Sequence, residues 1–275
     1  MNLRRNKYFD FVFILTLFFL FFFFLTSETV SIGLFSFTSS NSYPTQNDYL
    51  EKILTFDTYM IEGFKPMQFL MPVLVSTASL GFLYEKKGFL FHFFTLKQEK
   101  YWKALMKRLL FYSLVISIII FGAFVVFWII GVIIFPKVND PNGSFCYTRE
   151  TFSDIMGMDF YLNHRYGFYL AEGFLKCIPF TFIYSLISMC IGLITDKKYL
   201  SVLVPTLFYF LLIPLVSSLP IFKLKDYLYP NTIFVVGSME QPSTIALFLA
   251  FVLPIVLIIV MLIKIFFSKE RVGVS

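Results

Sequence analysis

Glu172 and Lys176 are the residues whose types and spacing come closest to a chemical site. They lie four positions apart near the start of the largely apolar segment 168–195. Residues at i and i+4 share one face of a helix, so the two side chains are predicted to form an ion pair and to reach the outer interface of a membrane. Ionisable groups within a membrane commonly line ion or substrate pathways, so the pair is also a candidate part of a substrate path.

The cysteines and histidines show no arrangement typical of a catalytic or metal site. Cys177 and Cys190 lie in one apolar segment and Cys146 lies in a loop, so no disulfide framework is evident. His92 and His164 fall in loops predicted to lie on opposite sides of a membrane, which excludes a shared metal site. The sequence also lacks a G-x-x-x-x-G-K-[ST] phosphate-binding loop. We therefore expect no enzymatic activity, metal or cofactor in this chain.

The composition indicates an integral membrane protein. Of 275 residues, 58% are hydrophobic and 15% are charged, and the mean hydropathy is +0.77. A water-soluble domain of this size needs more polar residues to cover its core. The fold class predicted is therefore an all-α membrane domain, because backbone groups in lipid must form their hydrogen bonds within the segment.

Six segments are apolar enough to cross a bilayer, which takes about 20 residues. The first follows three basic residues, as a signal peptide does. However, its apolar run is long and no small-x-small cleavage site follows, so it is predicted to be a true span. The six predicted spans are residues 8–27, 67–84, 109–135, 168–195, 199–222 and 243–263.

The distribution of Lys and Arg predicts that both termini are cytoplasmic. With the N-terminus inside, 15 of the 23 basic residues fall in the cytoplasmic segments, seven of them between positions 84 and 108. Cytoplasmic loops of membrane proteins are enriched in these residues. The net charge of +6 therefore reflects topology and gives no reason to expect nucleic-acid binding.

Three external loops, at 28–66, 136–167 and 223–242, are long enough to carry structure of their own. Apolar residues recur near helical spacing between Leu50 and Met60, which predicts a short amphipathic helix at the outer surface. The second loop opens with a turn cluster, NDPNGS, and is predicted to hold another short interfacial helix. The third is expected to be a compact re-entrant or surface element.

The cytoplasmic loop at 85–108 combines the densest basic cluster with a short aromatic stretch, FLFHFFTL. In a helix, Phe89, Phe93 and Leu96 share one face while His92 and Thr95 lie on another. The next helix is predicted to begin near position 98, because the following residues are good helix formers. The alternative interpretation is an ordinary basic loop whose aromatic residues sit at the membrane interface and whose lysines contact anionic lipid.

Residues 71–110, MPVLVSTASLGFLYEKKGFLFHFFTLKQEKYWKALMKRLL, resemble permease subunits of type 2 ABC exporters, the ABC-2 family. In those proteins an acidic residue ends the second span. A Gly, an aromatic or aliphatic stretch, a basic residue, a Tyr and a Lys then lead into the third span. The matching residues here are Glu85, Gly88, Phe89, Lys97, Tyr101 and Lys103.

This resemblance implies that residues from Gly88 to Thr95 form a coupling helix that docks on a separate ATPase, which binds the ATP. It also implies a second permease subunit, as a homodimer or heterodimer, in a bacterial plasma membrane. The candidate coupling residues are Glu85, Gly88, Phe89, Phe91, His92, Phe94 and Thr95.

The sequence thus predicts a membrane-spanning permease subunit of an ATP-driven exporter, working by alternating access on an amphipathic or hydrophobic cargo. A peptide, a lipid-linked compound and an antimicrobial are the cargo classes considered. The alternative is a non-transporting immunity or sensory membrane protein that binds a ligand through its external loops. A membrane-embedded enzyme is a third interpretation, disfavoured by the missing catalytic residues.

Overall fold

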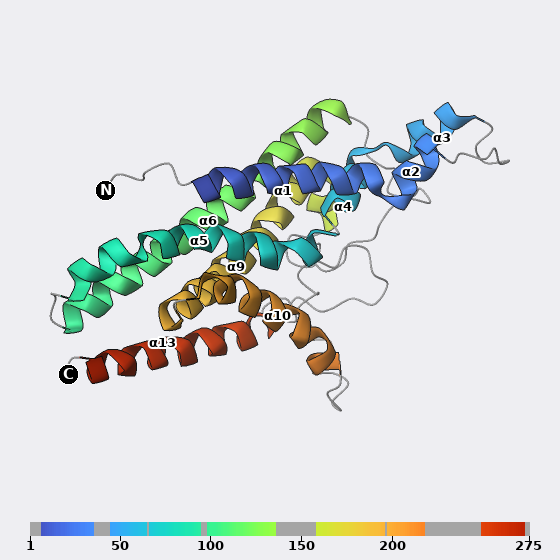
Figure 1. The fold of residues 1–275 in the computed structure, drawn as a ribbon. Helices are drawn as coiled ribbons and strands as arrows, with labels where there is room; N and C mark the ends of the chain where they lie inside the picture. The colour runs from blue at the N-terminus through green and yellow to red at the C-terminus, as the bar shows by residue number, and fades with distance from the viewer. Residues whose placement is uncertain are drawn as a thin grey trace.

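The computed structural model describes most of the chain and shows a bundle of α-helices (Figure 1). No β-strand occurs within the ranges it describes. These ranges are residues 7–35, 45–64, 66–94, 98–135, 158–195, 197–217 and 249–272. The predicted all-α class is therefore confirmed for this part of the chain.

The helices follow the order of the apolar segments, with shorter helices between them. Their bounds are α1 Lys7–Thr26, α2 Glu28–Phe35, α3 Gln46–Ile53, α4 Phe56–Phe64, α5 Met67–Phe94, α6 Gln98–Ile134, α8 Met158–Asn163, α9 Arg165–Ile194, α10 Lys198–Ser217 and α13 Val252–Val272.

Within the described residues, four helical stretches are long and apolar enough to cross a membrane: Lys7–Thr26, Met67–Tyr84, Lys100–Ile134 and Arg165–Ile194. The apolar stretches Lys198–Leu212 and Val252–Phe267 are shorter. The membrane character of the chain agrees with the prediction, and the count of six spans stays a prediction.

Large apolar side chains on the outside of the bundle fit this membrane character. α1 alone exposes a row of them along one face, which lipid accommodates and water does not. These residues are Phe11, Ile14, Phe18, Phe22 and Leu25.

The structure describes the last predicted span, 243–263, only from residue 249 onward. Within this part, α13 begins at Val252, after a turn at Ala250 and Phe251. Pro254 explains this start, because proline is well tolerated in the first turn of a helix, where its missing N–H has no intrahelical partner. Residues 243–248 lie outside the described residues.

α5 and α6 form a long helical hairpin. α5 continues without a break from Met67 to Phe94, and α6 begins at Gln98, where a helix start was predicted. The region treated as a loop at 85–108 is thus largely the helical ends of the two spans. α1 begins, and α13 ends, at the same end of the bundle as the tip of this hairpin (Figure 1). The placement of that end in the cytoplasm stays a prediction.

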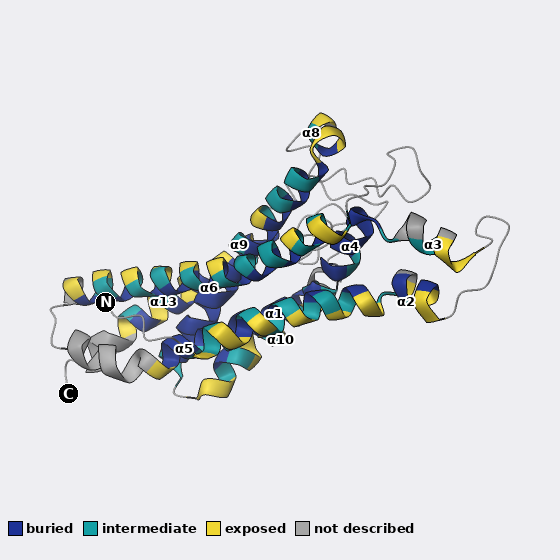
Figure 2. Ribbon diagram, turned by 90° about the horizontal axis from the view of Figure 1, so that it is seen from above, coloured by how far each residue is buried: buried dark blue, intermediate teal, exposed yellow. Residues whose placement is uncertain are grey.

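α9 lies at the centre of the bundle and contacts α5, α6, α10 and α13. Many residues of α9 are therefore buried, as Figure 2 shows. Small hydroxyl residues of α5, α6 and α9, such as Ser79, Ser117 and Thr181, are buried. Their side chains donate hydrogen bonds to backbone carbonyls one turn earlier. Small residues let membrane helices approach closely, and these local bonds satisfy the hydroxyl groups.

The first loop predicted to be external, residues 28–66, differs from its prediction. Instead of a single amphipathic surface helix, it holds α2, α3 and α4, and α4 is enclosed by the spanning helices. Of its nine residues, all except Glu62 are buried. α4 contacts α1, α5 and α6 and hydrogen-bonds α9 through Asp57. The interfacial helix predicted in the second external loop corresponds in part to α8, while residues 136–157 and 223–242 lie outside the described residues.

Glycine at position 131 of α6 permits the close approach of α4. A Cβ at Gly131 falls against the Tyr59 ring, whereas a Cβ at Gly122 lies 3.7 Å from Phe13, an ordinary van der Waals contact. Overpacking of this kind costs about 1–3 kcal/mol. We expect Gly131→Val to lower the thermal unfolding midpoint in detergent by several degrees and Gly122→Val to change it little. Equal midpoints for the two variants contradict the packing described here.

Candidate functional site: buried charges on α9

A row of polar and charged side chains runs along the buried face of α9. Arg165, Tyr169, Glu172 and Lys176 occupy positions i, i+4, i+7 and i+11, which place them on one face of the helix. All four are buried, with Glu172 6% exposed and Lys176 1% exposed. Charged groups are rarely buried unless paired, so each charge in this row needs a partner.

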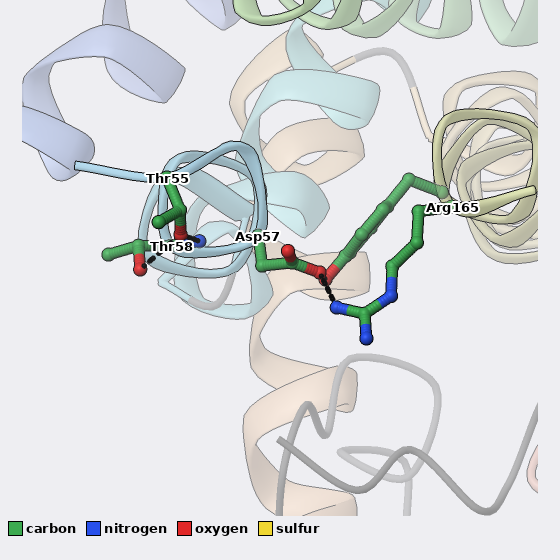
Figure 3. Close-up of polar contacts among 5 residues, drawn as sticks. Thr55, Asp57, Thr58 and Arg165 are labelled. Carbon is green, nitrogen blue, oxygen red and sulfur yellow. Dashed lines mark hydrogen bonds and ion pairs between the residues drawn. The ribbon is translucent and has the colours of Figure 1, made fainter. Parts of the chain in front are cut away.

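Asp57 of α4 is the partner of Arg165. Arg165 Nη1 donates a hydrogen bond to Asp57 Oδ1 at 2.9 Å, and the Tyr169 hydroxyl donates to the same oxygen at 2.8 Å. The guanidinium carbon of Arg165 also lies 4.5 Å from the centre of the Tyr161 ring, a cation–π contact. Figure 3 shows Arg165 reaching from α9 toward Asp57 on α4.

The N-terminus of α4 orients Asp57. Thr55 caps the helix, since its Oγ1 accepts a hydrogen bond from the Thr58 backbone N–H at 3.3 Å and lies 3.1 Å from Thr58 Oγ1. Both threonines lie on the side of α4 away from Arg165 (Figure 3). Asp57 follows in the first turn, where the helix dipole favours a negative charge.

Tyr59 anchors α4 to α6. Its hydroxyl donates to the Phe127 carbonyl at 2.9 Å, and its ring stacks on the Phe127 ring with centroids 4.1 Å apart. Burial raises the pKa of Tyr59, because desolvation disfavours the phenolate. The phenol therefore keeps its proton and remains a hydrogen-bond donor throughout the neutral range.

Glu172 and Lys176 form the ion pair predicted from their spacing. Lys176 Nζ donates to Glu172 Oε1 at 2.7 Å. The prediction that they reach the outer interface is wrong, because both side chains are buried. They follow Arg165 and Tyr169 inward along the same helix face, so the row carries both signs of charge.

A small cavity borders this row. It lies between α4, α6 and α9, so three helices contribute to its wall. Its lining residues are Met60, Phe64, Phe124, Tyr169, Glu172 and Gly173. Gly173 lies directly against the Phe124 ring, which leaves no room for a side chain there. The cavity shows that α4 does not fill all the space beside Glu172.

The candidate coupling residues lie far from these charges. Glu85, Gly88, Phe89, Phe91, His92 and Phe94 are all on the last turns of α5, and Thr95 lies outside the described residues. This end of α5 is at the opposite end of the bundle from α4 (Figure 1). The structure therefore does not bring the two predicted sets of site residues together.

The described residues contain no group of three or more His, Cys, Asp or Glu side chains able to hold a metal ion. Cys177 and Cys190 are buried with free thiols. His164, the residue before α9, is exposed, and its ring lies 5.6 Å from that of Phe160. These residues add no chemistry to the charged row.

Sequence reasoning missed Asp57, Arg165 and Tyr169. Asp57 and Arg165 are 108 positions apart, so no local spacing connects them. The sequence contains one signal that Asp57 has a buried partner, because this residue lies in a mostly apolar stretch, LTFDTYMI. A carboxylate within a helix of this composition needs a buried partner, although its identity depends on the tertiary fold.

Searches against protein-family models, curated proteins and solved structures found no match to this chain.

Proposed function

We propose that the chain is a membrane-spanning permease subunit of an ATP-driven exporter, with six spans and cytoplasmic termini, in a bacterial plasma membrane. A separate ATPase binds and hydrolyses ATP, and a second permease subunit completes the transporter. The observation that carries this proposal is the α5–α6 hairpin. Its basic and aromatic tip has the residue order of the coupling segment in ABC-2 permeases.

The lengths of the two helices support a tip outside the membrane. At 1.5 Å per residue, the 28 residues of α5 and the 37 residues of α6 span about 42 Å and 55 Å. The hydrocarbon core of a bilayer is about 30 Å thick. Each helix thus extends by about two turns or more beyond the core, and the basic residues at this end favour the cytoplasm.

The cargo proposed is an amphipathic or hydrophobic molecule, such as a peptide, a lipid-linked compound or an antimicrobial. The bundle interior supports this class because it combines aromatic side chains with a short row of buried charges. Ligand sites of this kind bind apolar groups over most of their surface and use a few polar groups to orient the ligand.

The test is purification of the chain in mild detergent from its native host, followed by mass spectrometry of the proteins that accompany it. We expect a near-stoichiometric ATPase with the unchanged chain and its loss with Phe91→Asp or Phe94→Asp, because a buried carboxylate disrupts an apolar contact. Phe267→Asp is the matched control. Phe267 is exposed near the end of α13, outside the coupling segment, and this variant is expected to retain the ATPase.

Purification of the unchanged chain without any ATPase contradicts the exporter proposal. That result favours the immunity or sensory function, in which the external loops bind a ligand and no ATP-driven partner is needed. If all three variants lose the ATPase equally, the loss reflects a general disturbance of the protein, and Phe91 and Phe94 have no specific role in coupling.

A further inference from the structure

Arg165 and Tyr169 together have the geometry of an anion-binding site. A guanidinium N–H and a phenol O–H, one helical turn apart on α9, converge on a single carboxylate oxygen at 2.9 Å and 2.8 Å. Charge-assisted hydrogen bonds of this kind are the usual means by which proteins bind carboxylate and phosphate groups. The Tyr161 ring packs on the guanidinium group and restricts its orientation.

The carboxylate that fills this position belongs to α4, a helix of nine residues. Asp57 lies in the first turn of α4, and a hydrogen bond from Tyr59 to the Phe127 carbonyl holds α4 to α6. Along the rest of α4, the wall facing α9 is formed by Met60 and Phe64, which border the small cavity. The carboxylate thus sits at one end of an apolar surface.

The charges around the position balance in pairs. Asp57 neutralises Arg165, and Glu172 neutralises Lys176 farther along α9. If α4 moves away, Asp57 leaves with it while Arg165 and Tyr169 stay on α9. The exposed wall then carries one uncompensated positive charge beside an internally paired Glu172, and it attracts an anion.

We propose that Arg165 and Tyr169 form an anion-binding site near the outer end of the bundle, and that Asp57 occupies it as a tethered substitute for a ligand. The exchangeable ligand is a carboxylate or phosphate group on an amphipathic molecule. Its anionic group takes the place of Asp57, and its apolar part takes the place of Met60 and Phe64. This inference does not depend on an ATPase partner, because an external sensor can use the same site.

The first experiment is chemical rescue of Asp57→Ala, which removes the carboxylate and leaves a space beside Arg165. We expect acetate or formate to raise the thermal midpoint of this variant in a saturable manner, with no such rise in the unchanged chain. Gluconate, a carboxylate too large for the space, controls for ionic strength. The double variant Asp57→Ala with Arg165→Met is expected to show no rescue, because the guanidinium is gone.

The second experiment uses the intact site and reports on ligand exchange. Trp128 follows Phe127 on α6 and donates to the Tyr166 carbonyl at 2.9 Å, so its fluorescence senses displacement of α4. In a Trp102→Phe background, Trp128 is the only tryptophan of the chain. We expect hexyl phosphate or hexanoate to produce a saturable change, and hexylamine and hexanol to produce none.

The two anionic probes distinguish a phosphate ligand from a carboxylate ligand. Tyr169→Phe removes one donor and keeps the charge, and it is expected to raise the half-saturating concentration at least fivefold. Any one of three results overturns the proposal. These results are equal responses to all four probes, an unchanged response in Tyr169→Phe, and rescue by acetate that persists without Arg165. Each outcome is independent of whether an ATPase accompanies the chain.

Discussion

Replacing Lys176 with Met while Glu172 remains is expected to destabilise the folded chain by about 3 kcal/mol or more, since removing one partner of a buried pair leaves an uncompensated charge. Lys176 is 1% exposed and its ammonium group lies 2.7 Å from the carboxylate. Neither side chain reaches the bundle surface, so bulk water does not solvate the charge that remains. The measurement is the midpoint of unfolding in mixed micelles of mild and denaturing detergent.

The double variant Glu172→Gln with Lys176→Met separates the charge from the packing. Because it removes both charges and keeps the side-chain lengths similar, we expect it to regain most of the lost stability. A double variant as unstable as Lys176→Met alone contradicts a pairing role. If the double variant folds and, under the proposed function, exports cargo at an unchanged rate, Glu172 and Lys176 are not part of the substrate path.

Replacing Arg165 with Met is expected to have a similar effect, of about 3 kcal/mol, concentrated on α4. The change leaves Asp57 buried with Tyr169 as its hydrogen-bond donor and without the guanidinium charge. α4 is then expected to open far more often, and local opening of a helix accelerates amide hydrogen exchange in proportion. The measurement is hydrogen–deuterium exchange over residues 56–64, compared with the central residues of α9.

Two matched variants make this result interpretable. Arg165→Lys keeps the charge but lacks the planar fork, and it is expected to restore only part of the protection. Asp57→Asn with Arg165→Met removes both charges and is expected to protect α4 better than Arg165→Met alone. Uniform loss of protection throughout the bundle in Arg165→Met argues against a local anchor, because it shows that the pair stabilises the whole fold instead.

The long spans were predictable because charged or polar residues bound their apolar runs. The first predicted span, 8–27, and the fourth, 168–195, lie within three residues of α1 and α9 at each end. Gly88 illustrates the opposite case. A glycine between basic residues and an aromatic stretch suggested a separate helix, yet α5 passes through it, because a single glycine weakens a helix by only about 1 kcal/mol.

The candidate site was predictable only where its contacts are local. Glu172 and Lys176 are one turn apart, so their pairing follows from helical geometry. Asp57 meets Arg165 only because α4 folds back among the spanning helices, and that path is set by tertiary packing against residues such as Phe127 and Gly131. A mostly apolar nine-residue helix between two spans has the same composition whether it lies on the surface of the bundle or inside it.

α6 is one unbroken helix, and its two ends meet different parts of the molecule. Gln98 at its start lies in the basic segment, while Phe127 near its end accepts the hydrogen bond from Tyr59 of α4. In a stiff helix of this length, a tilt of about 5° about the midpoint shifts Phe127, which lies about 16 Å from that midpoint, by roughly 1.4 Å. Such a shift exceeds the tolerance of a 2.9 Å hydrogen bond. Under the proposed function, force applied by an ATPase at one face of the membrane therefore reaches α4 at the other face through a single rigid element.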